Sequence, residues 1–206
     1  MSRPNQSGSA APASVEKIRD AALRLLAARG AAATSLREVA DAAGVSIGLV
    51  QHHFGTKAGL IEAVDAYVVD VVRNTLNPPP GTAPDPDSVN GVGSRVTAMI
   101  ADHTDVVDYM SRALMDNTPI GARIFDALFA IGDARWQRRA EQGQIAEGLD
   151  RTWAALNPIL LSLGALILRP HLERHLPEPF TTRTQLARWE DAVNTLIRQG
   201  QLRPES

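Results

Sequence analysis

Apolar residues recur at helical spacing along most of the chain, and no stretch alternates apolar and polar residues as a half-buried strand would. The N-terminal quarter shows this best, because three short apolar stripes are separated there by glycine and by residues that cap helices. The expected fold class is therefore all-α. The expected helices cover residues 14–29, 36–43, 46–53, 57–76, 92–101, 105–116, 119–140, 151–168 and 182–199.

Local signals indicate where several of these helices begin and end. Ser35 followed three residues later by Glu38 is a capping-box pattern, in which the two side chains bond each other's backbone amides. Five prolines within residues 77–87 cannot continue a helix and predict a loop. Further N-caps are expected at Ser46, Thr56 and Thr118, and helix ends at Gly30, Gly44 and Gly200.

Composition narrows the chemistry that the chain can perform. Its 206 residues, 44% of them hydrophobic, are enough to bury a core, and the absence of cysteine excludes disulfides, thiolate zinc sites and cysteine nucleophiles. Residues 1–57 carry seven basic and four acidic side chains, against 14 and 19 in the rest, so a modest positive charge gathers at one end. The most apolar stretch, residues 153–168, is shorter than the roughly 20 residues of a bilayer span, so no membrane helix is expected.

Residues 36–54 meet the requirements of a helix-turn-helix. The first helix needs a small residue facing the second, the turn needs a residue that tolerates positive φ, and the second helix needs an apolar residue turned inward. Ala40, Gly44 and Val50 supply these in order. With Val50 buried, the opposite side of the third helix is expected to expose residues that can enter a major groove, namely Ser46, Ile47, Gly48, Gln51 and His52.

Gly48 is unusual inside a short helix, where glycine costs roughly 1 kcal/mol relative to alanine. One interpretation is that the helix backbone must approach a DNA phosphate-sugar wall closely. The alternative is that glycine only relieves crowding against the neighbouring helix.

The stretch LREVADAAGVSIGLVQHHFGTKAGL, residues 36–60, resembles the DNA-binding signature of the TetR (tetracycline-repressor-like) family of regulators. The resemblance implies an N-terminal three-helix DNA-binding domain joined by a long helix to an α-helical ligand-binding and dimerisation domain. Members commonly carry one or two tyrosines before the His-Phe pair, where this chain has Gln51 and His52. The DNA-contacting residues implied by the resemblance are Ser35, Arg37, Ser46, Ile47, Gly48, Gln51, His52, His53 and Lys57.

The expected organisation has three parts, and the small, polar first residues do not suit a signal peptide. A flexible tail is expected over residues 1–13, a helix-turn-helix domain over 14–57 and an effector-binding and dimerisation domain over 58–206, which includes the loop 77–87. A cavity in the last part would suit a small, mostly apolar effector. Its expected lining is Met99, His103, Met110, Phe125, Phe129, Trp136 and Trp153, although such residues are ordinarily core.

Two copies of the chain are expected to act together, because one short helix covers only a few base pairs. The helices 151–168 and 182–199 would pair with their copies. The two recognition helices, residues 46–53 of each copy, would then lie about 34 Å apart or somewhat more and bind a pseudo-palindromic operator. The expected function is a cytoplasmic transcriptional repressor released by its effector. The expected interface residues are Leu160, Leu163, Gly164, Ile167, Trp189, Val193 and Leu196.

Short motifs in the chain are typical of other functions. Residues 44–48 spell G-x-S-x-G, the nucleophile elbow of serine hydrolases, but the elbow needs a preceding strand where this chain has helical spacing. His171 and His175 are four residues apart, yet no thiolate or zincin motif accompanies them. A small-molecule-binding protein that merely retains a helix-turn-helix stays an alternative. No catalytic residue, metal or cofactor is expected.

Overall fold

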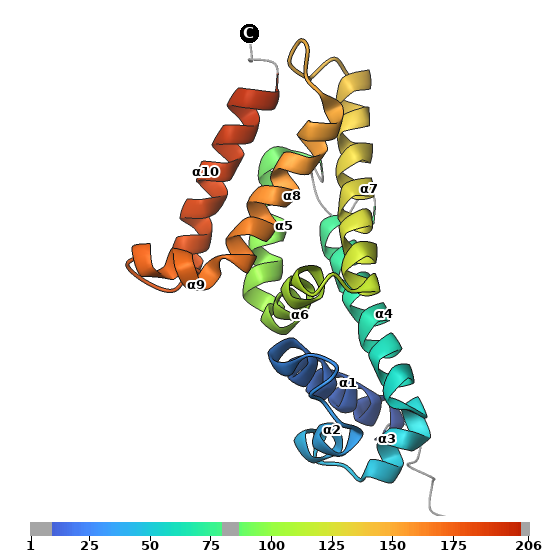
Figure 1. The fold of residues 1–206 in the computed structure, drawn as a ribbon. Coiled ribbons are helices and arrows are strands. Elements are labelled where there is room, and N and C mark those ends of the chain that lie inside the picture. Colours follow the sequence, from blue (N-terminus) through green and yellow to red (C-terminus); the bar gives the residue numbers. More distant parts are fainter. Residues whose placement is uncertain (1–9, 80–86, 203–206) are drawn as a thin grey trace, which may run out of the picture. The chain divides into compact units, whose positions relative to one another are not determined.

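The computed structural model describes residues 10–79 and 87–202, and the regular elements in these ranges are all helices (Figure 1). The predicted all-α fold class is therefore confirmed. The chain divides into two compact units, Met1–Val68 (unit 1) and Val69–Ser206 (unit 2). Most of the predicted tail, residues 1–9, and most of the proline-rich loop, residues 80–86, lie outside the described residues.

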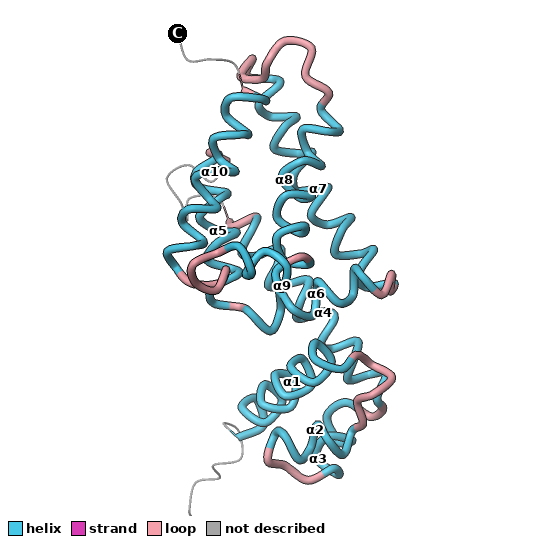
Figure 2. The backbone as a smooth tube through the Cα atoms, turned by 60° about the vertical axis from the view of Figure 1, so that its left-hand side comes forward, coloured by secondary structure: helices cyan, strands magenta, loops and turns pink. Residues whose placement is uncertain are grey.

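Unit 1 contains α1 (Ala10–Arg29), α2 (Leu36–Ala43), α3 (Ile47–Phe54) and the first part of α4 (Lys57–Leu76). Helix α1 packs on α2, and α2 packs on α3 (Figure 2). Burying each large apolar side chain fully stabilises the unit by about 1.5–3 kcal/mol. The core is formed by Ile18, Leu26, Val39, Val50, Leu60, Val64 and Val68.

The capping signals in unit 1 behave as the sequence predicts. The Ser35 hydroxyl accepts a hydrogen bond from the Glu38 amide at 3.2 Å, and the Glu38 carboxylate accepts one from the Ser35 amide at 2.9 Å. Gly30 and Gly44 end α1 and α2 with φ of 77° and 67°, a left-handed conformation that glycine adopts at little cost. The turn that separates α2 from α3 is therefore determined locally.

Unit 2 holds the last turns of α4 and the remaining helices. Helix α7 packs against both α6 and α8, and α10 packs against α5 and α8. Figure 2 shows α10 beside α5 and α8 beside α7. These remaining helices are α5 (Val89–Asp102), α6 (Thr104–Met115), α7 (Pro119–Glu141), α8 (Arg151–Ile167), α9 (Arg169–Leu172), the 3-10 helix η1 (Glu173–His175) and α10 (Arg183–Gln201).

The structure departs from the expected helix boundaries at both ends of the chain. Helix α1 begins at Ala10, four residues before the predicted start, because proline at position 12 is compatible with a first helical turn. The sequence predicts that the last helix ends at Gly200, and this prediction is wrong. The helix runs on to Gln201 and stops where Leu202 becomes extended and pairs with Ile145.

No single helix among residues 10–79 and 87–202 has both the length and the apolar composition of a membrane span. The stretches Arg151–Ile167 and Arg169–His175 reach those values only when taken together, and they are bent by 69°.

Candidate functional site

Helix α3 has one buried and one exposed side. Val50 is completely buried in the core of unit 1, whereas Gly48 and Gln51 are exposed. The Ser46 hydroxyl caps the helix by accepting a hydrogen bond from the Leu49 amide at 3.2 Å. Helix α3 therefore presents a short outer side that carries one amide side chain and one bare stretch of backbone.

Gly48 has room for a larger side chain. A Cβ atom added there would meet only the Ser46 hydroxyl oxygen, at 3.9 Å, which is an ordinary contact. The alternative that glycine relieves crowding against a neighbouring helix is therefore wrong. None of the described residues of unit 1 requires glycine at this position, so the other interpretation, a close approach of DNA to the backbone, stays a prediction.

The residues predicted to contact DNA lie on the outer sides of α2 and α3 and at the start of α4. Lys57 is the first residue of α4, where free backbone amides and the helix dipole favour an anion. The His52 and His53 rings lie edge to face, with centroids 5.3 Å apart. Ser35, Arg37, Ser46, Ile47, Gly48, Gln51 and His52 are exposed, and His53 and Lys57 are half-buried.

Glu38 is the acidic residue closest in sequence to this surface, and it is already engaged. Hydrogen bonds from the backbone and hydroxyl of Ser35, together with the nearby Arg29, lower the pKa of the Glu38 carboxyl. The Arg29 guanidinium lies 3.0 Å from the same carboxylate. Glu38 thus serves the start of α2.

The G-x-S-x-G motif does not form a nucleophile elbow. Ser46 follows α2 and the left-handed turn at Gly44, whereas the elbow needs a strand before its serine. The Ser46 hydroxyl acts as a helix cap.

Unit 2 contains a mostly apolar, partly open cavity of about 140 Å³. Its wall comes from α5, α6, α7, α8 and α10 and from Leu76 at the end of α4. Trp136 and Trp189 are its aromatic residues, and Arg135, Arg139 and Glu190 are its charged ones. The cavity suits a small apolar molecule with at least one polar group.

The structure brings together three of the residues predicted to line a cavity and separates the other four. Met99, Met110 and Trp136 line it. The lining does not include His103, between α5 and α6, or Phe125 and Phe129 on α7. Trp153 on α8 is 55% exposed.

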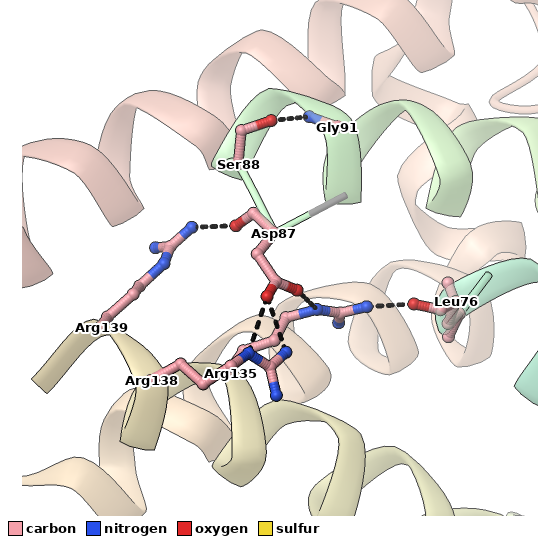
Figure 3. A network of polar contacts seen from close by, with 7 residues as sticks. All are labelled: Leu76, Asp87, Ser88, Gly91, Arg135, Arg138 and Arg139. Atoms are coloured by element: carbon pink, nitrogen blue, oxygen red, sulfur yellow. Dashed lines mark hydrogen bonds and ion pairs between the residues drawn. The ribbon is translucent and has the colours of Figure 1, made fainter. Parts of the chain in front are cut away.

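Three arginines of α7, two of which line the cavity, contact Asp87 (Figure 3). The Asp87 carboxylate lies 3.2 Å from the Arg135 Nε and 2.7 Å from an Arg138 Nη. Arg139 donates to the Asp87 carbonyl oxygen, and Arg135 donates to the Leu76 carbonyl oxygen. Arg135 therefore connects the end of α4 with the residue that precedes Ser88, the N-cap of α5.

The charges in this network influence one another. Partial burial raises the pKa of Asp87, but the hydrogen bonds and charges of Arg138 and Arg135 outweigh it, so the pKa lies below its usual range. Burial and the charge of Arg95 lower the pKa of Arg135, while Asp87 opposes them. Asp87 is thus ionised and favours the charged form of a largely buried arginine.

Helices α8 and α10 expose apolar side chains. Leu160 is 48% exposed and Leu196 is 61% exposed, and both line a shallow groove with Leu161. Of the other residues predicted for the dimer interface, Leu163, Trp189 and Val193 line the cavity, and Gly164 and Ile167 are half-buried. An outward face of α8 combines the exposed residues Trp153, Asn157, Leu160 and Leu161, and Leu168, directly after the helix, is exposed as well.

His171 and His175 lie on different elements, α9 and η1, and Arg174 contacts the His171 ring at 3.1 Å. Within the described ranges, no group of three or more histidine, aspartate or glutamate residues is arranged to hold a metal ion.

The sequence interpretation missed Arg135 and Arg139 as cavity residues, although a signal was present. Leu128 and Ile131 form an apolar stripe on α7 that continues at helical spacing into Arg135 and Arg139. Arginines on a stripe that should be buried indicate a charged site inside the fold.

Comparisons with known proteins agree with this geometry. Residues 18–64 match the model of the bacterial regulatory proteins, tetR family. The chain is 44% identical over 59 residues to the HTH-type transcriptional regulatory protein RaaS of Mycobacterium tuberculosis. That match covers 29% of this chain and only 27% of RaaS.

Solved structures resemble most of the chain. SmeT, the repressor of the Stenotrophomonas maltophilia multidrug efflux pump SmeDEF, is 20% identical with a TM-score of 0.65, over 92% of this chain and 90% of SmeT. AibR, solved in complex with isovaleryl coenzyme A and operator DNA, is 16% identical with a TM-score of 0.67, over 89% of this chain and 97% of AibR. At these identities the likeness concerns the fold.

Proposed function

This chain is a TetR-family protein by its DNA-binding domain and by its fold, and on that premise we propose that it is a homodimeric transcriptional repressor. It binds a pseudo-palindromic operator through α3, and a small effector in the cavity of unit 2 releases it. The observation that carries the proposal is the division of α3 into a buried Val50 side and an exposed side with Gly48 and Gln51.

The exposed side of α3 offers two ways to contact DNA. The Gln51 amide has the donor and acceptor needed to bond adenine in the major groove. The bare backbone at Gly48 allows the helix to approach the phosphate-sugar wall, and Lys57 at the start of α4 supplies a charge for a phosphate. His52 and His53 are suited to phosphates as well. These contacts use no catalytic group.

Dimerisation is supported by the exposed apolar face of α8 and α10. Leu160 is 48% exposed and Leu196 is 61% exposed, and contact of these apolar side chains with water is unfavourable. Both side chains become covered if two copies of the chain pair through these helices. Two copies also double the number of base pairs that are read, which a specific site requires.

Effector release is supported by the cavity and by α4. Helix α4 belongs to both units, since the division falls between Val68 and Val69. A ligand that favours one arrangement of the helices in unit 2 changes operator affinity several-fold if the coupling is about 1–3 kcal/mol. AibR, which has this fold, was solved with both a small molecule and operator DNA. Because its target is chromosomal DNA, the cytoplasm stays the predicted location.

Selection of bound duplexes from a random DNA library tests the proposal. The full chain should enrich a site with two related half-sites, about 10 base pairs or more apart from centre to centre. Gln51→Ala should relax the preference at one base pair in each half-site while the remaining positions are retained. If no sequence is enriched, and if affinity for DNA does not fall with salt, the chain is not a DNA-binding regulator.

A further inference from the structure

The wall of the cavity in unit 2 is mostly apolar but carries a few charged side chains. Arg135 and Arg139 lie one turn apart on α7, so both guanidinium groups belong to the same side of that helix. Glu190, the acidic residue of the wall, accepts hydrogen bonds from Ser94 at 2.8 Å and Thr97 at 3.0 Å. Among the residues that the structure describes, the wall therefore carries two cationic groups against one carboxylate, which is already engaged.

Arg135 is held in place by its contacts with Asp87 and Leu76. Its side chain is only 11% exposed, its Nε bonds the Asp87 carboxylate and its Nη2 donates to the Leu76 carbonyl oxygen. A guanidinium has five N–H donors in a planar fork and prefers to bind a carboxylate through two of them. An anion in the cavity would therefore meet a donor array that is already oriented.

We propose that the effector is a small apolar carboxylate whose carboxylate group binds Arg135 in competition with Asp87. The cavity volume of about 140 Å³ is close to that of the engineered protein cavity of about 150 Å³ that takes benzene. The apolar part of the effector is thus about the size of one aromatic ring or a short alkyl chain. Trp136 and Trp189 provide flat surfaces against which such a ring packs.

Competition at Arg135 also explains how effector binding in the cavity affects other parts of unit 2. When the effector takes over the guanidinium, the Asp87 carboxylate loses a partner and the Leu76 carbonyl loses its donor. Both residues lie at the end of a helix: Leu76 is the last residue of α4, and Asp87 directly precedes Ser88, the N-cap of α5. The ends of these two helices are the places that loosen.

This inference rests on the proposed function only in treating the cavity as the effector site. Its test therefore uses the full chain without DNA, so that a failure here leaves operator binding untouched, and a chain that fails to bind DNA can still bind the carboxylate.

The test measures binding of matched acid, amide and amine series built on benzoyl, phenylacetyl, hexanoyl and octanoyl groups, by calorimetry and by tryptophan fluorescence. Acids should bind at least about tenfold more tightly than the amides and amines of the same body, the change that one charge-assisted contact produces. An equal or stronger affinity for the amides or amines would overturn the proposal, and so would a panel in which no member binds.

Two variants separate a role in recognition from a role in folding. Arg135→Gln should reduce the acids to the affinity of the amides, whereas Arg123→Gln, at an exposed arginine of the same helix, should leave the preference intact. Asp87→Asn should increase affinity for the acids several-fold, because the competing anion is gone. A merely structural Asp87 would give unchanged or weaker binding, and that result would refute the competition.

Hydrogen exchange provides a readout for the connection to α4. Saturating acid should speed exchange in the last turn of α4 and the first turn of α5, and the amide controls should not. Unchanged exchange in both turns on acid binding would exclude Arg135 as the connection.

Discussion

A Cβ atom at Gly59 would stand 2.4 Å from the carbonyl oxygen of Phe54, so the end of α3 and the first turn of α4 touch through bare backbone. Non-bonded atoms of this kind do not approach within 3.0 Å. Phe54 is the last residue of α3, and Lys57 begins α4 two residues before Gly59. The glycine therefore determines how closely the end of α3 and the start of α4 approach each other.

Gly59→Ala should destabilise unit 1 by about 1–3 kcal/mol, which is the usual cost of forcing an extra methyl group into a packed site. The obstacle is backbone, which cannot swing aside as a side chain does. Thermal unfolding followed by circular dichroism measures the effect. Operator affinity should fall as well, because the start of α4 must shift. An unchanged melting temperature would show that the junction of α3 and α4 adjusts freely.

Gly48→Ala is the matched substitution and should have the opposite effect on stability. Its Cβ would make only an ordinary contact with the Ser46 hydroxyl, and alanine favours a helix over glycine by roughly 1 kcal/mol, so α3 should become more stable. Affinity for the selected operator should nevertheless fall at least several-fold, because the added methyl group separates the helix backbone from DNA. A variant that is more stable and binds DNA as well as the parent would remove Gly48 from the interface.

Unit 1 could be predicted from the sequence almost completely. Its turns rest on local signals, such as the Ser35–Glu38 capping box and the left-handed Gly44, which depend on residues a few positions apart. The burial of Val50 follows from the same local pattern. The predicted exposure of Gly48 and Gln51 is found as well, while their contact with DNA stays a prediction.

Unit 2 was less predictable because its site depends on distant residues. The pairing of Asp87 with Arg135 joins positions 48 residues apart, from the end of the proline-rich loop to α7. Helical spacing marks a buried side but does not say which of two buried sides faces a cavity. For this reason Leu163 and Val193, expected between two copies, line the cavity, whereas Trp153, expected in the cavity, is exposed.

Lys57→Gln should weaken operator binding and lower the slope of log affinity against log salt concentration by about one. The reason is that each phosphate neutralised by a protein cation releases counterions. Lys17→Gln is the control, because Lys17 is an exposed lysine on α1 and should leave the slope unchanged. Titrations of the selected duplex between about 50 and 200 mM salt measure both slopes. Equal slopes in the two variants would argue against a phosphate at Lys57.

Leu160→Asp combined with Leu196→Asp should convert the proposed dimer to monomers and abolish specific operator binding. Each substitution places a carboxylate where the dimer would bury a leucine, and removing that charge from water is costly. Light scattering during gel filtration measures the mass. Met115→Asp is the control, since Met115 is 59% exposed on α6 and should leave the oligomer intact. A double variant with the mass of the parent would exclude this face as the dimer interface.

Asp87→Asn should destabilise unit 2 by about 1–2 kcal/mol at neutral pH, between the values for exposed and for buried ion pairs, because Arg135 loses its carboxylate partner. The pKa of Asp87 is lowered in the folded chain, so the carboxylate stabilises fully above its unfolded pKa of about 3.9 and loses this effect as pH falls through the folded pKa. The difference between parent and variant should therefore be constant from about pH 5 to 8 and shrink below about pH 4. Urea unfolding across this range measures it. A difference that persists unchanged in acid would mean that Asp87 acts through its shape and not through its charge.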